Sequence, residues 1–164
     1  MLSPTHGLRR ESKPNMISQK AKYALKALLE LAQVQDEDAL LITEIAERQH
    51  IPKKFLEQIL LDLKHQGLVH SKRGRYGGYG LLKDPRQITF GQIMRIIDGP
   101  LAPLPCLSRM AYRRCEDCHD EENCEIRRVF ARAYEATAQI LDRTTLADAL
   151  AQGAQGPARS VLAG

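Results

Sequence analysis

The sequence lacks the features that mark several other classes of protein. No apolar run approaches the roughly 18 residues that a membrane-spanning helix needs. The first fifteen residues contain no apolar segment of the kind found in signal peptides. No P-loop, catalytic-triad signature or metal-hydrolase motif is present, and cysteine is absent outside one stretch of 19 residues. These absences predict a cytoplasmic protein that neither crosses a membrane nor catalyses a reaction.

The composition is that of an ordinary globular protein. The chain has 164 residues, of which 43% are hydrophobic and 27% charged, and this is about one domain with a core of its own. Residues 1–15 and 151–164 lack hydrophobic periodicity, so we expect a disordered leader and a disordered tail. Met1 and Met16 are both candidate native starts.

Three helices are predicted between Ser18 and Gly67. Ser18 suits the N-cap of the first, Thr43 the N-cap of a short second helix, and Pro52 the first turn of the third. A short helix, a tight turn and a helix with a polar outer face form the helix-turn-helix pattern. The third helix has an apolar stripe made of Phe55, Leu56, Ile59, Leu60 and Leu63, and a polar face made of Lys53, Lys54, Glu57, Gln58, Asp62 and Lys64.

A glycine-rich hairpin follows the third helix. Residues 68–72 and 79–82 have the pattern of two strands, and the segment RGRYGG between them supplies glycines for the positive φ angles of a hairpin tip. A loop that binds nucleotide phosphates is the rival interpretation, but it would have to lead into a helix rather than a strand. The predicted fold is therefore mainly α with a small β-hairpin wing, a winged helix-turn-helix.

Positive charge is concentrated in this region. Residues 51–83 contain seven Lys and Arg residues and only two acidic ones. Such an excess is typical of a nucleic-acid face, although a solvated charged surface would look the same. Arg73 and Arg75, at the tip of the hairpin, are placed to contact phosphate or enter a minor groove.

Four cysteines are spaced C-x8-C-x2-C-x5-C, at Cys106, Cys115, Cys118 and Cys124. In a reducing cytosol, clustered thiols indicate metal ligands or redox groups before disulfides. Four thiolates are a complete ligand set for a zinc ion or an iron–sulfur cluster. We therefore predict a metal site in this segment.

A long amphipathic helix is predicted after Cys124, ending near Arg143. Its apolar stripe consists of Ile126, Val129, Phe130, Ala133, Thr137, Ile140 and Leu141. A helix of this length is often a dimerisation helix, but packing on its own domain is equally compatible with the pattern. Before the cysteines, Thr89 is predicted to cap a helix with the sequence FGQIMRIID, and after the long helix Thr145 begins a last short turn.

These segments together resemble the Rrf-two family of winged-helix regulators, the group of IscR, NsrR, RirA and CymR. The resemblance covers residues 16 to about 150, on the segments ISQKAKYALKALLELA, ITEIAERQHIPKKFLEQILLDLKHQGLV, RGRYGGY, ITFGQIMRIIDGPLAPLPC and ILDRTTLADAL. It implies a homodimer that binds a double-stranded DNA operator. It also implies a DNA-binding domain over 16–100, a cysteine-rich sensor loop over 101–124 and a dimerisation helix over 125–150 that crosses its partner's.

The resemblance also assigns DNA-reading positions. The family's base-reading residues match Lys54, Glu57 and Gln58, and its minor-groove arginine matches Arg73. A glutamine can pair with adenine, a glutamate can accept from the cytosine amine, and a lysine can donate to guanine or phosphate. The predicted DNA contacts are these four residues together with Lys53, Lys72 and Arg75, each with a solvated surface residue as the alternative.

Relatives with a cluster hold it by three cysteines, the last two often five residues apart, which matches Cys118 and Cys124. The IscR-like fourth ligand is a histidine at the position of Arg127, and arginine has no lone pair to offer. The implied ligands are therefore Cys118 and Cys124, completed by Cys106, by Cys115 or by both, with His119 a weaker candidate.

Three interpretations of the thiols stay open. In the first, the thiols hold an iron–sulfur cluster of the 2Fe-2S or the 4Fe-4S type. In the second, they hold structural zinc, and in the third they are cluster-free thiols, as in CymR-like relatives. The first predicts a repressor whose operator affinity follows iron, redox or nitric oxide status. The last predicts a regulator of sulfur metabolism that acts through a protein effector or thiol oxidation.

Overall fold

The structure is a computed structural model that describes residues 17–34, 39–75 and 77–154. The predicted leader, the start at Met16 and most of the predicted tail lie outside these ranges. Within them, every helix is too short or too polar to cross a membrane.

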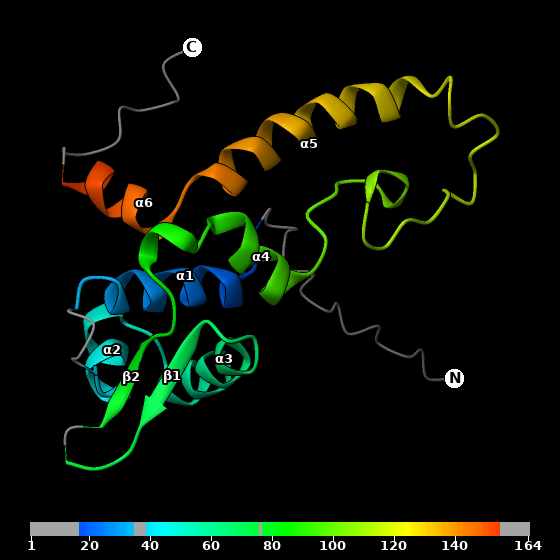
Figure 1. The fold of residues 1–164 in the computed structure, drawn as a ribbon. Coiled ribbons are helices and arrows are strands. Elements are labelled where there is room, and N and C mark those ends of the chain that lie inside the picture. The colour runs from blue at the N-terminus through cyan, green and yellow to red at the C-terminus, as the bar shows by residue number, and fades with distance from the viewer. Residues whose placement is uncertain (1–16, 35–38, 76, 155–164) are drawn as a thin grey trace, which may run out of the picture.

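Three helices and a hairpin form the first half of the fold (Figure 1). Helices α1 (Gln19–Leu31), α2 (Ile42–Gln49) and α3 (Lys53–His65) pack on one another. Strands β1 (Val69–Lys72) and β2 (Gly78–Leu81) pair antiparallel, with Val69 opposite Leu81 and Lys72 opposite Gly78. This arrangement confirms the predicted mainly helical fold with a small β-hairpin.

The second half begins on that unit and then leaves it. After a 3-10 turn (Pro85–Gln87), helix α4 (Phe90–Asp98) packs on α1. The cysteine segment follows, with a second 3-10 turn at Pro105–Leu107, and then helices α5 (Glu125–Arg143) and α6 (Leu146–Gly153). In Figure 1, α5 runs above α4 and carries the cysteine segment at the end that lies away from α1, α2 and α3.

The core lies among α1, α2, α3 and the hairpin. Fully buried apolar side chains come from every one of these elements and from α4 and α6, namely Leu28, Ile45, Leu56, Ile59, Leu60, Leu63, Val69, Ile93 and Leu146. Phe55 was predicted in the apolar stripe of α3 but is 38% exposed. Its ring meets the edge of Tyr23 on α1 at a centroid distance of 5.7 Å, so it packs at the rim of the core.

Helix caps agree with the sequence at three ends and differ at one. Ser18, Thr89 and Thr145 are N-caps, as predicted. The predicted cap at Thr43 is wrong, because α2 begins at Ile42 with Leu41 as its N-cap. The Glu44 carboxylate accepts a hydrogen bond of 2.9 Å from the Leu41 amide, and this satisfies a backbone donor that would otherwise be free.

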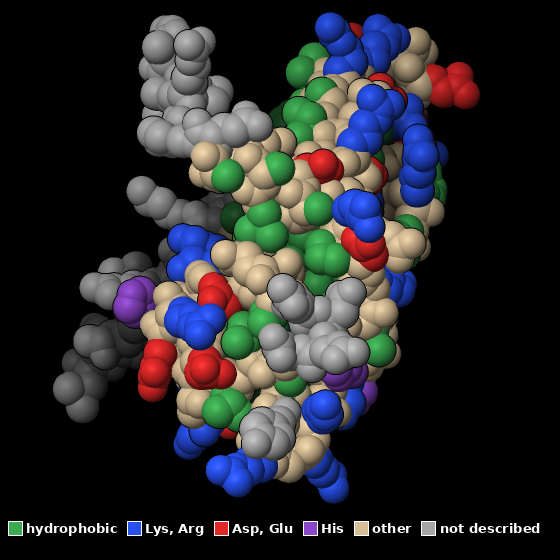
Figure 2. Space-filling model, turned by 60° about the vertical axis from the view of Figure 1, so that its left-hand side comes forward, with side chains coloured by type: hydrophobic (Ala, Val, Ile, Leu, Met, Phe, Trp, Pro, Cys, Tyr) green, Lys and Arg blue, Asp and Glu red, His purple; other side chains and the backbone are tan. Residues whose placement is uncertain are grey.

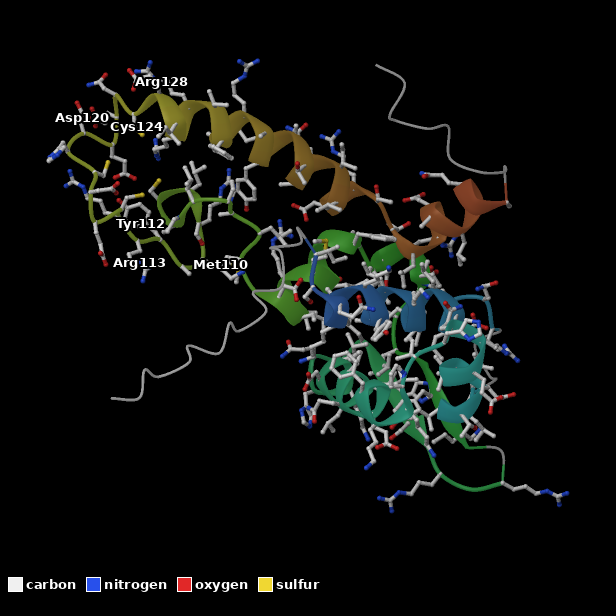
Figure 3. The ribbon with its side chains drawn as sticks, turned by 180° about the vertical axis from the view of Figure 1, so that it is seen from behind. Met110, Tyr112, Arg113, Asp120, Cys124 and Arg128 are labelled. Carbon is white, nitrogen blue, oxygen red and sulfur yellow. The ribbon has the colours of Figure 1, made fainter. Side chains whose placement is uncertain are left out.

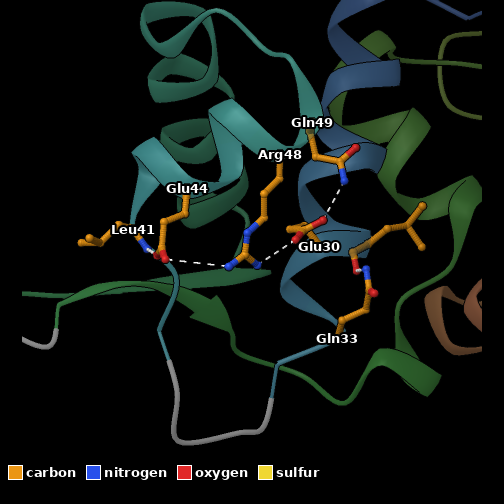
Figure 4. A network of polar contacts seen from close by, with 7 residues as sticks. Glu30, Gln33, Leu41, Glu44, Arg48 and Gln49 are labelled. Carbon is orange, nitrogen blue, oxygen red and sulfur yellow. Dashed lines mark hydrogen bonds and ion pairs between the residues drawn. The ribbon is translucent and has the colours of Figure 1, made fainter.

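A polar network ties α1 to the helix-turn-helix (Figure 4). Glu30 of α1 accepts from Arg48 at 3.0 Å and from Gln49 at 2.6 Å, both on α2. The same Arg48 lies 3.8 Å from Glu44. The Glu30 side chain is only 12% exposed, so these contacts are partly shielded from water. They hold α2, the first helix of the helix-turn-helix, on α1.

The hairpin needs glycine because other backbone lies against it. Leu40 forms a bridge with Tyr79, with hydrogen bonds of 3.0 and 2.8 Å in the two directions. A Cβ atom at Gly78 would lie 2.4 Å from the Leu40 carbonyl oxygen, and one at Gly77 would lie 2.5 Å from that of Lys72. A larger residue at position 78 would displace the chain that precedes α2, and one at position 77 would displace the turn of the hairpin.

The C-terminal helices differ in one boundary from the sequence prediction. Residues 151–153 belong to α6 rather than to the predicted tail, whereas α5 ends at Arg143 and a break at Thr144 and Thr145 precedes the last short helix, as the sequence predicts. Backbone bonds at this break join it to α4: Phe90 N–H donates to Thr144 at 3.0 Å, and Leu146 N–H donates to Ile88 at 2.9 Å.

Candidate nucleic-acid interface and metal centre

The seven predicted DNA contacts lie on two neighbouring elements and are all exposed. The first two turns of α3 carry Lys53, Lys54, Glu57 and Gln58, and the end of β1 and the turn after it carry Lys72, Arg73 and Arg75. Figure 2 shows Lys and Arg side chains at the lower end of the molecule, where the hairpin lies. The structure therefore presents one polar helix face beside one basic hairpin.

The hairpin is held to α3 at two levels. The Leu68 amide donates to the Leu63 carbonyl at 3.0 Å, and the Lys64 ammonium donates to the Ser71 hydroxyl at 2.7 Å. The second contact joins the last turn of α3 to β1. Helix and hairpin are thus oriented together.

Gln58 is positioned by a chain of contacts that reaches α1. Its amide donates to Asp62 at 3.0 Å, and the other oxygen of Asp62 accepts from Lys20 at 2.7 Å. The hydrogen bond from Lys20 lowers the pKa of the Asp62 carboxyl below 3.8, with a smaller contribution from Gln58. The amide of Gln58 keeps a second N–H and its carbonyl oxygen for a base edge.

All four cysteines line one cavity of about 490 Å³, together with His119 and several acidic residues. Cys106, on the second 3-10 turn, is buried at 6% exposure, while Cys115, Cys118 and Cys124 are half-buried and none is in a disulfide. Figure 3 shows this segment from behind, with Cys124, Asp120 and Tyr112 at one end of the molecule.

Backbone bonds shape the segment around the thiols. The Cys118 amide donates to the Cys115 carbonyl at 3.2 Å, which closes a turn over C-x2-C. The Arg114 guanidinium donates to the carbonyls of Cys118 and His119 at 3.0 and 3.1 Å. The Asp120 carboxylate accepts from the amides of Glu122 and Asn123. Residues 114–123 therefore have a defined path.

Cys124 is the N-cap of α5, and its sulfur accepts from the Arg127 amide at 3.4 Å. Arg127 Nε lies 3.5 Å from Glu121 Oε1, and both atoms are buried without a hydrogen bond. Glu121 also accepts from the Tyr112 hydroxyl at 2.7 Å.

The donor set fits a thiolate-bound metal, although the thiols are not gathered as ligands. In the described ranges no three His, Cys, Asp or Glu side chains form a metal-binding group. Loss of hydration raises the pKa of the Cys115 thiol, and the hydrogen-bonded Cys106 thiol beside it raises it further. A bound cation would reverse this effect, because it stabilises the thiolate.

Part of the predicted apolar stripe of α5 is exposed to water, whereas its members Phe130, Thr137 and Leu141 line a cavity with Met94 and residues 100–103. No residue of α5 is buried, and Ile126, Val129 and Ile140 are 62%, 66% and 67% exposed. Their spacing, with the exposed Ala133 and Ala136 between them, is that of positions a and d in a coiled coil. An exposed apolar surface of this kind marks an interaction site.

Sequence reasoning missed the residues that position the candidate site. The Gln58–Asp62 contact could have been found from its i, i+4 spacing. Lys20, Ser71 and Arg114 have no such signal, because Lys20 lies 42 residues from its partner and the other two act through loop or hairpin geometry.

Comparison with known proteins gives one family. The Rrf2 (Rrf-two) model, described as "Iron-dependent Transcriptional regulator", matches residues 17–152. A protein from Rhodobacter capsulatus, named as an rrf2-like HTH-type transcriptional regulator, is 56% identical to this chain over 150 residues. The match covers 90% of this chain and 99% of that protein.

Two solved structures are similar over most of their length. The structure titled "The Structure of CymR (YrzC) the Global Cysteine Regulator of B. subtilis" is 34% identical with a TM-score of 0.69, covering 83% of this chain and 96% of that one. The structure titled "T. potens IscR" is 30% identical with a TM-score of 0.67, and the match covers 87% of this chain and 93% of that one.

We expect the Asp62 carboxyl to titrate below 3.8, measured by carbon-detected NMR. The stability that this carboxylate contributes is present above pH 3.8 and is lost as the pH falls through the lowered pKa. Lys20→Met removes the main cause and should raise the pKa of Asp62 toward 3.8, whereas Lys22→Met, an exposed neighbour on α1, should leave it unchanged. An Asp62 pKa that does not respond to Lys20→Met would contradict the described contact.

Proposed function

The chain belongs to the Rrf2 family of transcriptional regulators, and from that premise we propose the function of its two sites. The protein is a regulator and not an enzyme. We propose that it acts as a homodimer that binds a specific operator through α3 and the hairpin, and that a cluster held by its four cysteines controls this affinity.

One observation supports the DNA-reading role more than any other. The exposed Lys54, Glu57 and Gln58 share the outer face of α3, and the hairpin that carries Arg73 is bonded to the same helix through Lys64. A reading helix in the major groove needs polar side chains of this kind. The basic hairpin beside it supplies phosphate or minor-groove contacts.

Glu57 indicates that the face reads bases instead of only attracting phosphate. A carboxylate that faces DNA lowers affinity through its charge unless it accepts a hydrogen bond from a base. Glu57 is exposed and makes no ion pair among the described contacts, so its carboxylate is available to a cytosine amine.

The DNA-reading proposal predicts different effects for two substitutions. In a duplex selected from random sequences, Gln58→Ala should cost about 1–3 kcal/mol and relax specificity at one base pair. Arg73→Ala should weaken binding and reduce the slope of log affinity against log salt by about one.

Arg132→Ala, an exposed cation on α5, is the matched control and should change the affinity little. Fluorescence anisotropy at several salt concentrations measures the operator affinity of all three variants. Operator binding by the wild type that does not change with salt would contradict the proposal.

We propose an iron–sulfur cluster at the cysteine cavity, with Cys106, Cys115, Cys118 and Cys124 as its ligands. Support comes from the four thiols on one cavity and from a family described as iron-dependent. Such a cluster supplies redox and ligand-exchange chemistry that responds to iron, oxidants or nitric oxide.

The place of the cysteines suggests how a signal could reach DNA. Residues 101–124 connect α4 of the DNA-binding unit to α5, so ordering of this segment can alter the relative position of the two reading helices in a dimer. A change in operator affinity requires that the two states of the segment differ in free energy when DNA is bound.

A second candidate is a cluster-free regulator. The similarity to a structure titled as the global cysteine regulator of B. subtilis favours it. In that case the thiols act by oxidation, bind structural zinc or have no role in sensing, and the signal arrives through a protein partner.

Purification without oxygen tests the cluster proposal. We expect a coloured protein with visible absorption, and iron and inorganic sulfide in equal amounts. Cys118→Ala and Cys124→Ala should lose the colour, and so should Cys106→Ala and Cys115→Ala, whose iron content tests whether both are ligands.

A colourless protein without iron would overturn the cluster proposal and favour the cluster-free candidate. Zinc in place of iron would favour the structural metal. If Cys124→Ala lost the cluster but kept the operator affinity of the wild type, coupling between the cluster and DNA binding would be contradicted.

A further inference from the structure

An ion pair joins the C-terminal end of α5 to α4. Both guanidinium nitrogens of Arg95 donate to Asp142, with Nη1 2.5 Å from Oδ1 and Nη2 2.9 Å from Oδ2. The side chains are 28% and 43% exposed. A fork-to-fork pair of this kind fixes the relative orientation of the two groups as well as their distance.

Gly91 makes room for this pair. A Cβ atom at Gly91 would lie 1.9 Å from Asp142 Oδ1 and 3.0 Å from Arg95 Nη1. Glycine is unfavourable inside a helix, and Gly91 lies in the first turns of α4 with no positive φ to require it. The space that it leaves for the pair is the physical reason for a glycine here.

Tyr134, two turns before Asp142 on α5, contacts the same guanidinium. The hydrogen bond that Arg95 donates to Asp142 raises the pKa of Arg95, and the Tyr134 hydroxyl raises it further. The same pair lowers the pKa of Asp142. Arg95 is thus held by two residues of α5.

The pair lies where the direction of α5 is set. The backbone bonds between α4 and the break after α5 lie beside it, while the opposite end of α5 begins at Cys124. The 18 residues from Cys124 to Asp142 span about 27 Å of helix. A small rotation at Arg95 and Asp142 therefore displaces the cysteine end, and a partner's α5 with it, by a large distance.

We propose that Arg95 and Asp142 are positioning residues that set the angle between α5 and the DNA-binding unit, and thereby the spacing of the two reading helices in the dimer. This inference rests on the proposed function, because it needs a dimer that binds two half-sites. Neither residue lies on α3 or the hairpin, so their effect reaches DNA through α4 and α1.

Operators with altered half-site spacing test the proposal on the full-length protein. The selected operator, the same operator with one extra base pair at its centre, and a single half-site are compared by anisotropy. The wild type should bind the first much more tightly than the second. In Arg95→Gln and Asp142→Asn the ratio of these two affinities should fall about threefold or more, while affinity for the single half-site stays within about twofold.

Two further variants separate geometry from charge. Gly91→Ala keeps both charges but displaces the Asp142 carboxylate, and it should lower the ratio of the two operator affinities as Arg95→Gln does. Arg95→Lys keeps the charge without the fork and should give an intermediate ratio. Arg86→Gln, which removes the same chemistry from the exposed Arg86–Asp84 pair, is the matched control and should behave as the wild type.

An unchanged spacing ratio in Arg95→Gln and Gly91→Ala, with the fold intact by circular dichroism, would overturn the inference. So would equal losses on the single half-site and on the full operator, since these indicate general destabilisation. A wild type that binds no duplex DNA would instead mean that the proposed function itself is wrong.

Discussion

The exposed apolar stripe of α5 is the constraint on which the rest of the structure depends. Helix α5 contacts α4 and the second 3-10 turn, but none of its 19 residues is buried, and Ile126, Val129 and Ile140 are each more than 60% exposed. A second copy of the same stripe is the simplest cover, because identical surfaces pair across a two-fold axis. Such an axis would also pair two reading helices, as operators with two half-sites require.

The two sites of the protein lie at opposite ends of one connected series of elements. Helix α3 packs on α1, α1 on α4, and α4 on α5, and the cysteine segment begins where α4 ends and closes where α5 begins. Among the described residues, the cavity that the four cysteines line includes no residue of α3 or of the hairpin. In the proposed function, the thiols therefore influence DNA binding through the position of α5.

The sequence predicted the features that depend on residues close together in the chain, such as helix caps and helix ends. Ser18, Thr89 and Thr145 are recognisable caps because each accepts from a backbone amide three residues ahead, and the long helix after Cys124 ends at Arg143 as its apolar spacing indicates. The start of α2 was missed, since it depends on the Leu40–Tyr79 bridge and on Glu44. Asp142 and Arg95 are 47 residues apart, and no pattern along the chain joins them. The predicted ligand cysteines do share a cavity, but the burial of Cys106 and the bracing by Arg114 required the folded chain.

Sedimentation equilibrium of Val129→Glu beside Arg128→Glu tests the central claim most directly. These residues are neighbours near the start of α5, both exposed, and only Val129 lies on the stripe (Figure 3 labels Arg128). The account predicts a dimeric wild type, a dimeric Arg128→Glu, and a monomeric Val129→Glu that no longer binds its operator, because a buried unpaired carboxylate would be costly. A wild type that is monomeric at micromolar concentration, or a Val129→Glu protein that dimerises as the wild type does, would contradict it.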